Sequence, residues 1–282
     1  MAVDSYGKAT DFYVLTPVIK QRMASNETIC YEYPFSKTAR LFLRFEQLMS
    51  RFDAYTQHLT LWETESSIRV LLDLFDLTSR VDLKGDVLRE FDRLKVSLDK
   101  RLTAATGTDE RAVLEQQKRR LHDLTLHVNR LGGQIVAHLV NHDFFNAIRQ
   151  RNSIPGGLNS FDLPLYHYWL QLPMAQRQDE LQKWIAPFEH LNVAVATILA
   201  LIRNNNPIES LCAEHGYYER ALDTAAPVQM IRLWLPTNAT CFPEISGGKH
   251  RLSIRFFEPL EFAKRPRQDD ARVDFDLMNC TL

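Results

Sequence analysis

The sequence lacks a strong net charge, a long uninterrupted apolar run and an N-terminal signal segment. It carries 34 basic and 35 acidic residues, so its formal net charge is −1. Bulk electrostatics therefore predicts no general affinity for nucleic acid or for anionic membranes. The longest apolar stretch, residues 191–202, is interrupted by Asn192 and Thr197 and is too short to span a bilayer. With no apolar segment of the signal-peptide type at its start, we expect a cytoplasmic protein that binds neither nucleic acid nor membrane.

Closely spaced cysteines are also absent. Cys30, Cys212, Cys241 and Cys280 lie far apart in the sequence and form no C-x-x-C motif. In a chain of 282 residues, this spacing predicts reduced and mostly buried thiols, as in cytosolic proteins.

Motifs of catalysis are scarce as well. His138 and His142 lie four residues apart, a spacing that suits metal ligands on a helix, but no third ligand follows in a known pattern. The stretch 246–250, SGGKH, lacks the spacing and the final Ser or Thr of a phosphate-binding loop, and no G-x-S-x-G elbow occurs. We expect no metal, no cofactor and no enzymatic activity. An enzyme that uses His138, His142 or His167 remains the alternative interpretation.

Apolar periodicity predicts a helical domain over residues 35–205. Residues 1–27 match no clear period and are typical of a loose N-terminal extension, while residues 28–34 are rich in β-formers and predict a single strand. After that strand, apolar residues recur at spacings of three and four, with Ser36 as a candidate N-cap. The domain is expected to end with two separate helices, at 175–184 and 190–203.

Two apolar stripes in this domain are unusually regular. One runs from Val87 to Leu102 and the other from Val113 to Leu131. Stripes of this kind predict either a packed helical bundle or part of a homodimer face. The sequence leaves both interpretations open.

Past residue 206 the apolar period changes from helical to two. Residues 228–235, 251–256 and 273–278 predict short strands, joined by turns such as the one at Gly247 and Gly248. An antiparallel β-domain is therefore expected over residues 206–282. The predicted fold class is α+β, with a mainly helical N-terminal and central part and a C-terminal antiparallel sheet. We expect the early strand at 28–34 to join that sheet.

Residues 148–173 contain the chain's densest group of glycines, prolines and aromatic residues, which restrict the conformation of this segment. Gly156 and Gly157 permit positive φ, and Pro164 prevents the preceding helix from continuing. Aromatic residues then surround His167. A loop with this composition has a defined shape and is expected to position a functional group. For His167 itself, a satisfied core histidine is the expected state, with a polar anchor in an aromatic groove as the alternative.

A basic row is predicted on the strand at 251–256. Arg251 and Arg255 share one face of that strand, opposite its apolar face, and Lys249 and His250 add positive charge at its start. Two guanidiniums at this spacing suit a carboxylate-rich peptide, because each donates charge-assisted hydrogen bonds. An ordinary solvated sheet face is the commoner origin of such a row. A nucleic-acid-binding module is a further alternative, built on these arginines with Lys264, Arg265 and Arg267.

Five segments carry a resemblance to a known family. They are YEYPFSKTARLFLRFEQL (31–48), LLDLFD (71–76), LREFDR (88–93), IRQRNSIPGG with the FDLP and histidine that follow it (148–173), and PEISGGKHRLSIRF (243–256). In this order they resemble the ZapD family of bacterial cytoplasmic proteins, which bind the tubulin-like division protein FtsZ. The resemblance begins near residue 28 and extends to the C-terminus, so the first 26 residues lie outside it.

The resemblance implies a binding protein without catalytic activity. A helical part would form a two-fold homodimer and would be joined to an antiparallel β part. Each copy would bind the short C-terminal tail of FtsZ, so that the dimer cross-links filaments into bundles at the mid-cell division ring.

The resemblance also implies partner-binding positions. They are Arg44 in the first helix, Arg80 after the second helix, His167 in the aromatic segment, and Arg251 and Arg255 on the late strand. We add Lys249 to this set for its charge beside the arginine row. One family position that is usually basic falls on Asp143, which reverses the charge there.

Overall fold

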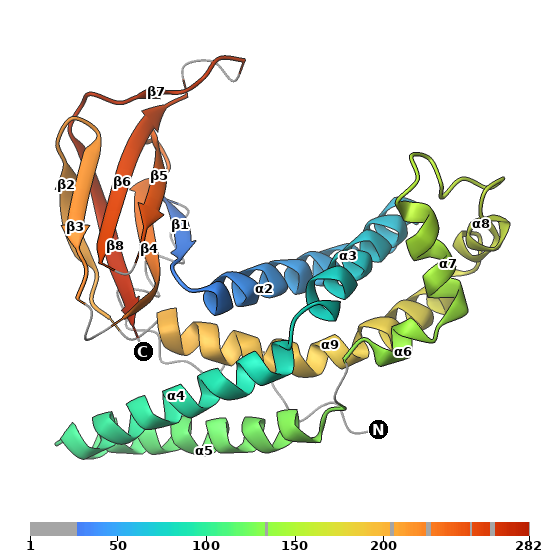
Figure 1. The fold of residues 1–282 in the computed structure, drawn as a ribbon, viewed down its shortest axis with the longest axis horizontal. Helices are drawn as coiled ribbons and strands as arrows, with labels where there is room; N and C mark the ends of the chain where they lie inside the picture. The colour runs from blue at the N-terminus through green and yellow to red at the C-terminus, as the bar shows by residue number, and fades with distance from the viewer. Residues whose placement is uncertain are drawn as a thin grey trace. The chain divides into compact units, whose positions relative to one another are not determined.

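The computed structural model describes residues 27–132, 135–203, 206–223, 227–248, 250–259 and 263–281. Its fold class is α+β, as predicted (Figure 1). The described residues form two compact units: 27–41 with 197–281 make up the β unit, and 42–196 make up the helical unit. Apart from Glu27, the predicted N-terminal extension lies outside the described residues.

Two antiparallel sheets build the β unit (Figure 1). Sheet A has the order β1 (Thr28–Pro34), β4 (Val228–Pro236), β8 (Val273–Thr281) and β2 (Glu209–Ala213). Sheet B has the order β3 (Tyr217–Ala221), β6 (Arg251–Glu258) and β5 (Phe242–Gly247), with β7 (Arg267–Gln268) also paired to β6. Side chains from one face of each sheet pack into a shared core, so the unit is a β sandwich.

The early strand joins the late sheet, as predicted. β1 pairs with β4 from Thr28 opposite Pro236 to Pro34 opposite Met230. The predicted N-cap at Ser36 is confirmed just after this strand. The Ser36 hydroxyl accepts a hydrogen bond from the Ala39 backbone N–H at 2.9 Å. This cap satisfies one of the free donors at the start of the first long helix.

The cysteines are less buried than the sequence predicts. Cys30 is exposed, Cys212 and Cys241 are partly buried, and Cys280 is buried. The prediction was wrong because alternation along β1 and β2 places Cys30 and Cys212 on the face of sheet A that points away from the sandwich core. All four thiols are free, and burial raises the pKa of Cys280 to about 12.

Among the described residues between β1 and β2, the structure forms eight helices. They are α2 (Lys37–Thr56), α3 (Leu61–Ser79), α4 (Leu83–Ala104), α5 (Thr108–Arg130), α6 (Ala137–Val140), α7 (Asp143–Asn152), α8 (Pro164–Leu170) and α9 (Met174–Arg203). The boundaries between the two units fall within α2 and α9.

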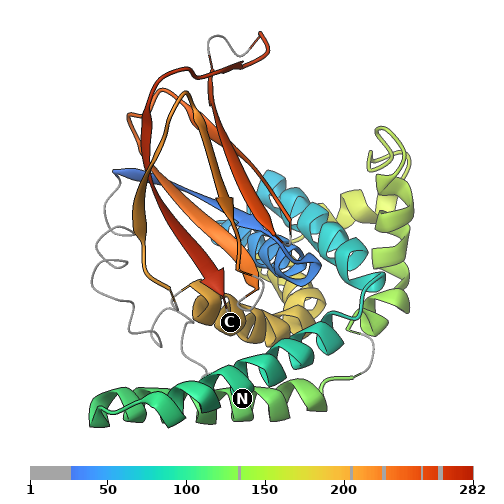
Figure 2. The same cartoon turned by 60° about the vertical axis from the view of Figure 1, so that its left-hand side comes forward.

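The two regular apolar stripes pack against each other within one chain. α4 and α5 lie side by side as a helical hairpin (Figures 1 and 2). The stripe residues Val87, Phe91, Leu94 and Leu98 of α4, and Leu114, Leu121, Leu124 and Val128 of α5, are buried. Of the two interpretations left open by the sequence, the packed bundle therefore accounts for these residues.

α9 is one helix where the sequence predicts two. Pro187 lies inside it and removes one backbone donor, which normally ends or kinks a helix. Trp184, Ile185, Phe188 and Leu191 around this position are at most 1% exposed, so packing on both sides of the proline outweighs its local preference.

α9 is much longer than the apolar run at residues 191–202, which by itself is too short to span a bilayer. With 30 residues, the helix is long and apolar enough by composition to cross a membrane, but 56% of its most apolar window is buried inside the structure. Core helices of globular proteins pass the same test of length and hydropathy.

A cluster of one carboxylate and two guanidiniums ties β1 to its neighbours within the β unit. Glu32 accepts hydrogen bonds from Nε and Nη2 of Arg203, both at 2.8 Å, and Nε of Arg232 lies 2.9 Å from its Oε1. Burial acts to raise the pKa of Glu32, but the hydrogen bonds and charges of the two arginines outweigh it and hold the pKa below its ordinary value. The cluster is therefore ionised at neutral pH.

The substitution Glu32→Gln tests how far this cluster stabilises the β unit. It leaves Arg232, which is 4% exposed, without a compensating charge, so we expect the free energy of unfolding at pH 7 to fall by about 3 kcal/mol in a urea titration. The matched control is Glu209→Gln, because the Glu209 side chain is 41% exposed in its pair with Arg220; its effect should stay below about 1 kcal/mol.

The same variant predicts a pH dependence. An acid whose pKa is lowered by folding stabilises the protein above its unfolded pKa, and this contribution is lost as the pH falls through the folded value. The difference between wild type and Glu32→Gln should therefore shrink as the pH falls through the lowered pKa of Glu32. Equal destabilisation by the two substitutions at pH 7 would contradict the role of the cluster.

Candidate functional site

The arginine row lies where the sequence predicts it, on the outer face of sheet B. Leu252, Ile254 and Phe256 are 0% exposed and belong to the sandwich core. Because side chains alternate along a strand, Arg251 and Arg255 of β6 point to the opposite face, where both are exposed. Burial of the apolar residues thus fixes the direction of the two guanidiniums.

Arg251 already has a carboxylate partner. Its Nη2 donates a short hydrogen bond to Oε2 of Glu219 on the neighbouring strand β3, and it lies 3.4 Å from the Tyr217 hydroxyl. The same hydroxyl donates to Glu219 at 2.5 Å. The hydrogen bond from Tyr217, together with that from Arg251, lowers the pKa of Glu219 despite an opposing effect of desolvation. A ligand of Arg251 must therefore compete with an ionised intramolecular carboxylate.

Arg255 is the more available of the two cations. Its cross-strand neighbours are Tyr217 on β3 and Glu244 on β5. Within the described ranges, the side chain of Arg255 forms no hydrogen bond or ion pair. A carboxylate ligand could therefore bind the Arg255 guanidinium without first displacing an intramolecular ion pair, although Glu244 lies on the same face.

The surface between the two arginines is polar and small. Ser253 lies between them on β6, and its hydroxyl is 2.8 Å from that of Ser246 on β5. The side chains between the two arginines on this face are therefore short hydroxyls. The arrangement suits recognition of an acidic peptide, because it offers fixed donors for carboxylate oxygens.

The remaining predicted residues lie elsewhere. Lys249 is outside the described residues. Arg44 on α2, Arg80 at the C-cap of α3 and His167 on α8 belong to the helical unit and are all exposed. No hydrogen bond or ion pair among the described residues joins these three side chains to one another, so the structure does not gather them into one cluster.

His167 is not the core histidine that the sequence favours. In α8 the buried aromatic residues are Tyr166 and Trp169, which stack with ring centroids 6.2 Å apart. Because α8 is helical and not extended, His167 and Tyr168 fall on its other side, and both are exposed. His167 is therefore accessible to a partner.

One residue that holds α8 in place was missed at the sequence level. Arg177, 7% exposed, donates from Nη1 to the Leu170 carbonyl at 2.6 Å and from Nη2 to the Leu59 carbonyl at 2.9 Å. It thereby links the end of α8 to the turn before α3. An arginine flanked by glutamines on a helix gives no sequence signal for such a contact.

The loop before α8 depends on its glycines for two different reasons. Gly156 has a φ of +73°, which non-glycine residues rarely adopt. A Cβ at Gly157 would lie 2.2 Å from the Arg151 carbonyl oxygen, so this position requires glycine for close approach and not for positive φ.

A model of the ZapD family, described as a cell division protein, matches residues 43–255. The chain belongs to the ZapD family. It is 34% identical to the cell division protein ZapD of Methylococcus capsulatus over 257 residues, which cover 90% of this chain and 98% of that protein. The ZapD proteins of Nitrosomonas eutropha and Nitrosomonas europaea are 32% identical over 90% of this chain and over 100% and 95% of their own lengths. The chain accordingly has a role in cell division.

One position departs from what the resemblance to the ZapD family implies. Asp143 is the first residue of α7 and is exposed. A carboxylate at a helix N-terminus interacts favourably with the backbone dipoles, whereas a basic residue there would not. The structure thus gives Asp143 a local stabilising role.

The histidines of the alternative enzyme interpretation are engaged in local contacts. His138 has its Nδ1 3.1 Å from the Ile135 carbonyl oxygen and its Nε2 3.1 Å from that of Trp184. His142 accepts the Phe145 N–H at Nδ1 over 3.2 Å, and its Nε2 lies 3.2 Å from Glu180. In the part of the chain that is described, no three His, Cys, Asp or Glu side chains are placed to hold a metal.

The substitution Glu219→Gln tests whether Glu219 competes for Arg251. Without the carboxylate, Arg251 is free to bind a ligand, so the affinity of the ZapD-family chain for an acidic peptide should rise by about twofold to fivefold, the range expected for an exposed pair. Fluorescence anisotropy of a labelled peptide measures the change. Glu209→Gln on sheet A is the control and should leave the affinity unchanged; a decrease for Glu219→Gln would show that Glu219 assists binding.

Proposed function

We propose that this protein binds the C-terminal tail of FtsZ on the outer face of sheet B and, as a homodimer, cross-links FtsZ filaments. The observation that carries the proposal is the pair of outward guanidiniums at Arg251 and Arg255, in a chain of the ZapD family. We place its action in the cytoplasm at the mid-cell division ring, without nucleic acid or membrane as a partner.

Weak binding at each site is an expected property of this mechanism. A disordered tail that becomes ordered on the sheet loses about 2–5 kcal/mol of the interaction free energy. Two sites in one dimer raise the effective concentration of the second tail to roughly millimolar. Because a filament displays many tails, the dimer would remain attached while individual contacts exchange. Cross-linking would thus depend on having two sites and not on the affinity of one.

We also propose contributions from Arg44, Arg80, His167 and Lys249, on the basis of the family resemblance and the local charge. Arg44, Arg80 and His167 are exposed in the helical unit, so each is accessible to a filament. Their effect should be smaller on binding of the isolated tail than on bundling, if they contact other parts of FtsZ.

The substitutions Arg251→Glu and Arg255→Glu test the site. Each reverses a charge that is proposed to bind a carboxylate, so we expect the affinity for the FtsZ tail peptide to fall by about tenfold or more. The control is Arg272→Glu. The side chains of Arg251 and Arg272 are 63% and 65% exposed, and each is paired with one carboxylate. Isothermal titration with the tail peptide gives the affinities, and circular dichroism checks the fold. Equal losses for all three variants would point to a general effect of charge.

Bundling by the wild-type protein should depend on salt and on the tail. Since the contacts are ionic and exposed, light scattering of FtsZ polymers in the presence of this protein should decline steeply between about 50 and 300 mM salt. FtsZ without its tail should show no rise in scattering. A rise that is insensitive to salt, or that persists without the tail, would contradict the proposed site.

A further inference from the structure

The outer face of sheet B continues beyond the arginine row as a pair of aromatic rings. Phe242 of β5 is opposite Phe257 of β6, and the two rings stack with centroids 6.0 Å apart and planes inclined by 27°. Because the adjacent Phe256 belongs to the sandwich core, alternation places Phe257 on the outer face together with Arg255. Both rings are half-buried. This ring pair, Phe242 with Phe257, therefore presents apolar surface beside the arginine row.

The charges on this face are balanced in number. On β3, β5 and β6, it carries two guanidiniums, Arg251 and Arg255, and two carboxylates, Glu219 and Glu244. Glu219 is paired with Arg251, and Glu244 lies opposite Arg255 in the strand register. With no net charge from these four groups, the face exerts little long-range attraction on an acidic peptide. Firm binding of such a peptide would therefore need a contact that is not ionic.

The position of the ring pair suits such a contact. Arg255 and Phe257 are two residues apart on β6, so their side chains leave the face about 6.6 Å from each other. An extended peptide repeats its own side chains at the same interval. A peptide that lies along β6 with a carboxylate on Arg255 would place the side chain two residues away over the ring pair. Half-exposed aromatic rings favour an apolar or aromatic side chain at that place.

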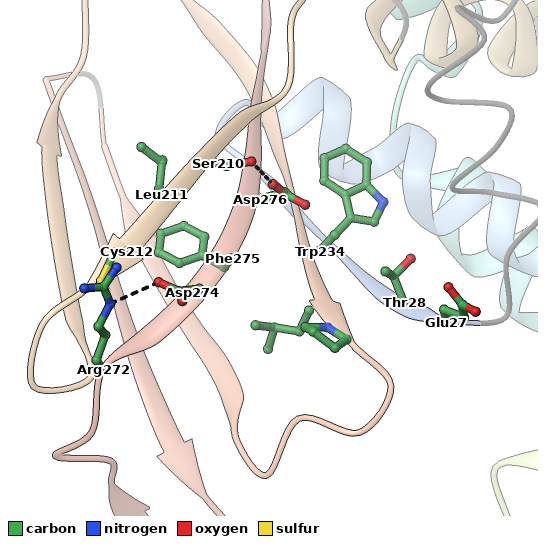
Figure 3. A pocket seen from close by; sticks show the side chains of 12 residues that line it. Glu27, Thr28, Ser210, Leu211, Cys212, Trp234, Arg272, Asp274, Phe275 and Asp276 are labelled. Atoms are coloured by element: carbon green, nitrogen blue, oxygen red, sulfur yellow. Dashed lines mark hydrogen bonds and ion pairs between the residues drawn. The ribbon is translucent and has the colours of Figure 1, made fainter.

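The aromatic side chain on the outer face of sheet A has different surroundings. Trp234 lines a cleft of about 750 Å³ with Arg272, Asp274 and Asp276 (Figure 3), but it is only 4% exposed. Arg272 Nε lies 3.2 Å from Asp274 Oδ1 (Figure 3), so the arginine in that wall already has a partner. A peptide that carries both acidic and apolar side chains is therefore better suited to the outer face of sheet B.

We propose that the ring pair is a second subsite for the FtsZ tail and binds an apolar side chain of the same segment whose carboxylate binds Arg255. The inference rests on the proposed function, because it takes the tail as the occupant of this face. The ligand is then an extended segment in which an apolar residue lies about two positions from an acidic one. The ring pair would reject acidic segments that lack this residue, which the arginines alone do not distinguish.

The substitutions Phe242→Ala and Phe257→Ala test the subsite in a titration with the FtsZ tail peptide. Each removes one ring of the pair, so we expect the affinity to fall by about fivefold to tenfold. Because neither substitution changes a charge, the affinity should keep the salt dependence of the wild type. Arg255→Glu, in contrast, should weaken that dependence. Isothermal titration at several salt concentrations measures both effects.

Phe144→Ala is the matched control. Phe144 is also half-buried, and its ring contacts those of Trp169 and Trp184 with centroids 5.8 and 5.9 Å away. It lies on α7 in the helical unit, so its loss should leave the affinity for the tail peptide unchanged.

A fluorine label tests the same contact without removing a ring. We expect the fluorine NMR resonance of para-trifluoromethylphenylalanine at position 257 to shift and to saturate as the tail peptide is added. The same label at position 144 should not respond. This measurement decides the question even if an alanine variant folds poorly.

The outcomes separate the subsite from the proposed function. Weaker binding by Arg251→Glu and Arg255→Glu, with wild-type affinity for both phenylalanine variants, would overturn the subsite and leave the proposed function standing. Wild-type affinity in all four variants would overturn both. A resonance at position 257 that does not respond to saturating peptide, or an equal loss of affinity for Phe144→Ala, would also overturn the subsite.

Discussion

The alternation of buried and exposed side chains in the β sandwich is the constraint on which the outward arginine row of the β unit depends. Burial of Leu252, Ile254 and Phe256 in the shared core forces Arg251 and Arg255 to the outer face of sheet B. The same rule, applied to β1 and β2 of sheet A, places Cys30 and Cys212 on that sheet's outer face. One apolar core therefore positions the cationic row, and a one-residue slip of register would turn it toward the core.

The ion pairs of the β unit differ in burial and therefore in role. The Glu32 cluster with Arg203 and Arg232 is largely removed from solvent and serves the fold. The pair between Arg251 and Glu219 is exposed and adds little stability, so its carboxylate can be displaced by a ligand. An exposed pair of this kind keeps the arginine oriented while leaving it available, which fits a partner that binds and dissociates readily.

Strict periodicity made much of the fold predictable from sequence. The period of two at 251–256 identified the outward arginines, and the regular stripes predicted the helices α4 and α5 but left open whether they pack in one chain or in a dimer. Long-range contacts account for what was missed. Pro187 continues a helix because its surroundings are buried, Glu219 reaches Arg251 from a strand 32 residues away, and no pattern near His167 distinguishes a buried side of α8 from an exposed one. The roles of the site residues remain predictions.

The central claim is that the FtsZ tail lies on sheet B between Arg251 and Arg255, over Ser253. Site-specific photo-crosslinking tests it most directly, with benzoylphenylalanine incorporated at position 253 and, for comparison, at position 167 in the helical unit. The account predicts that position 253 forms a crosslink to FtsZ which maps to the C-terminal tail and disappears with tail-less FtsZ. Efficient crosslinking at position 167 with none at position 253 would contradict it, because the tail would then bind the helical unit instead.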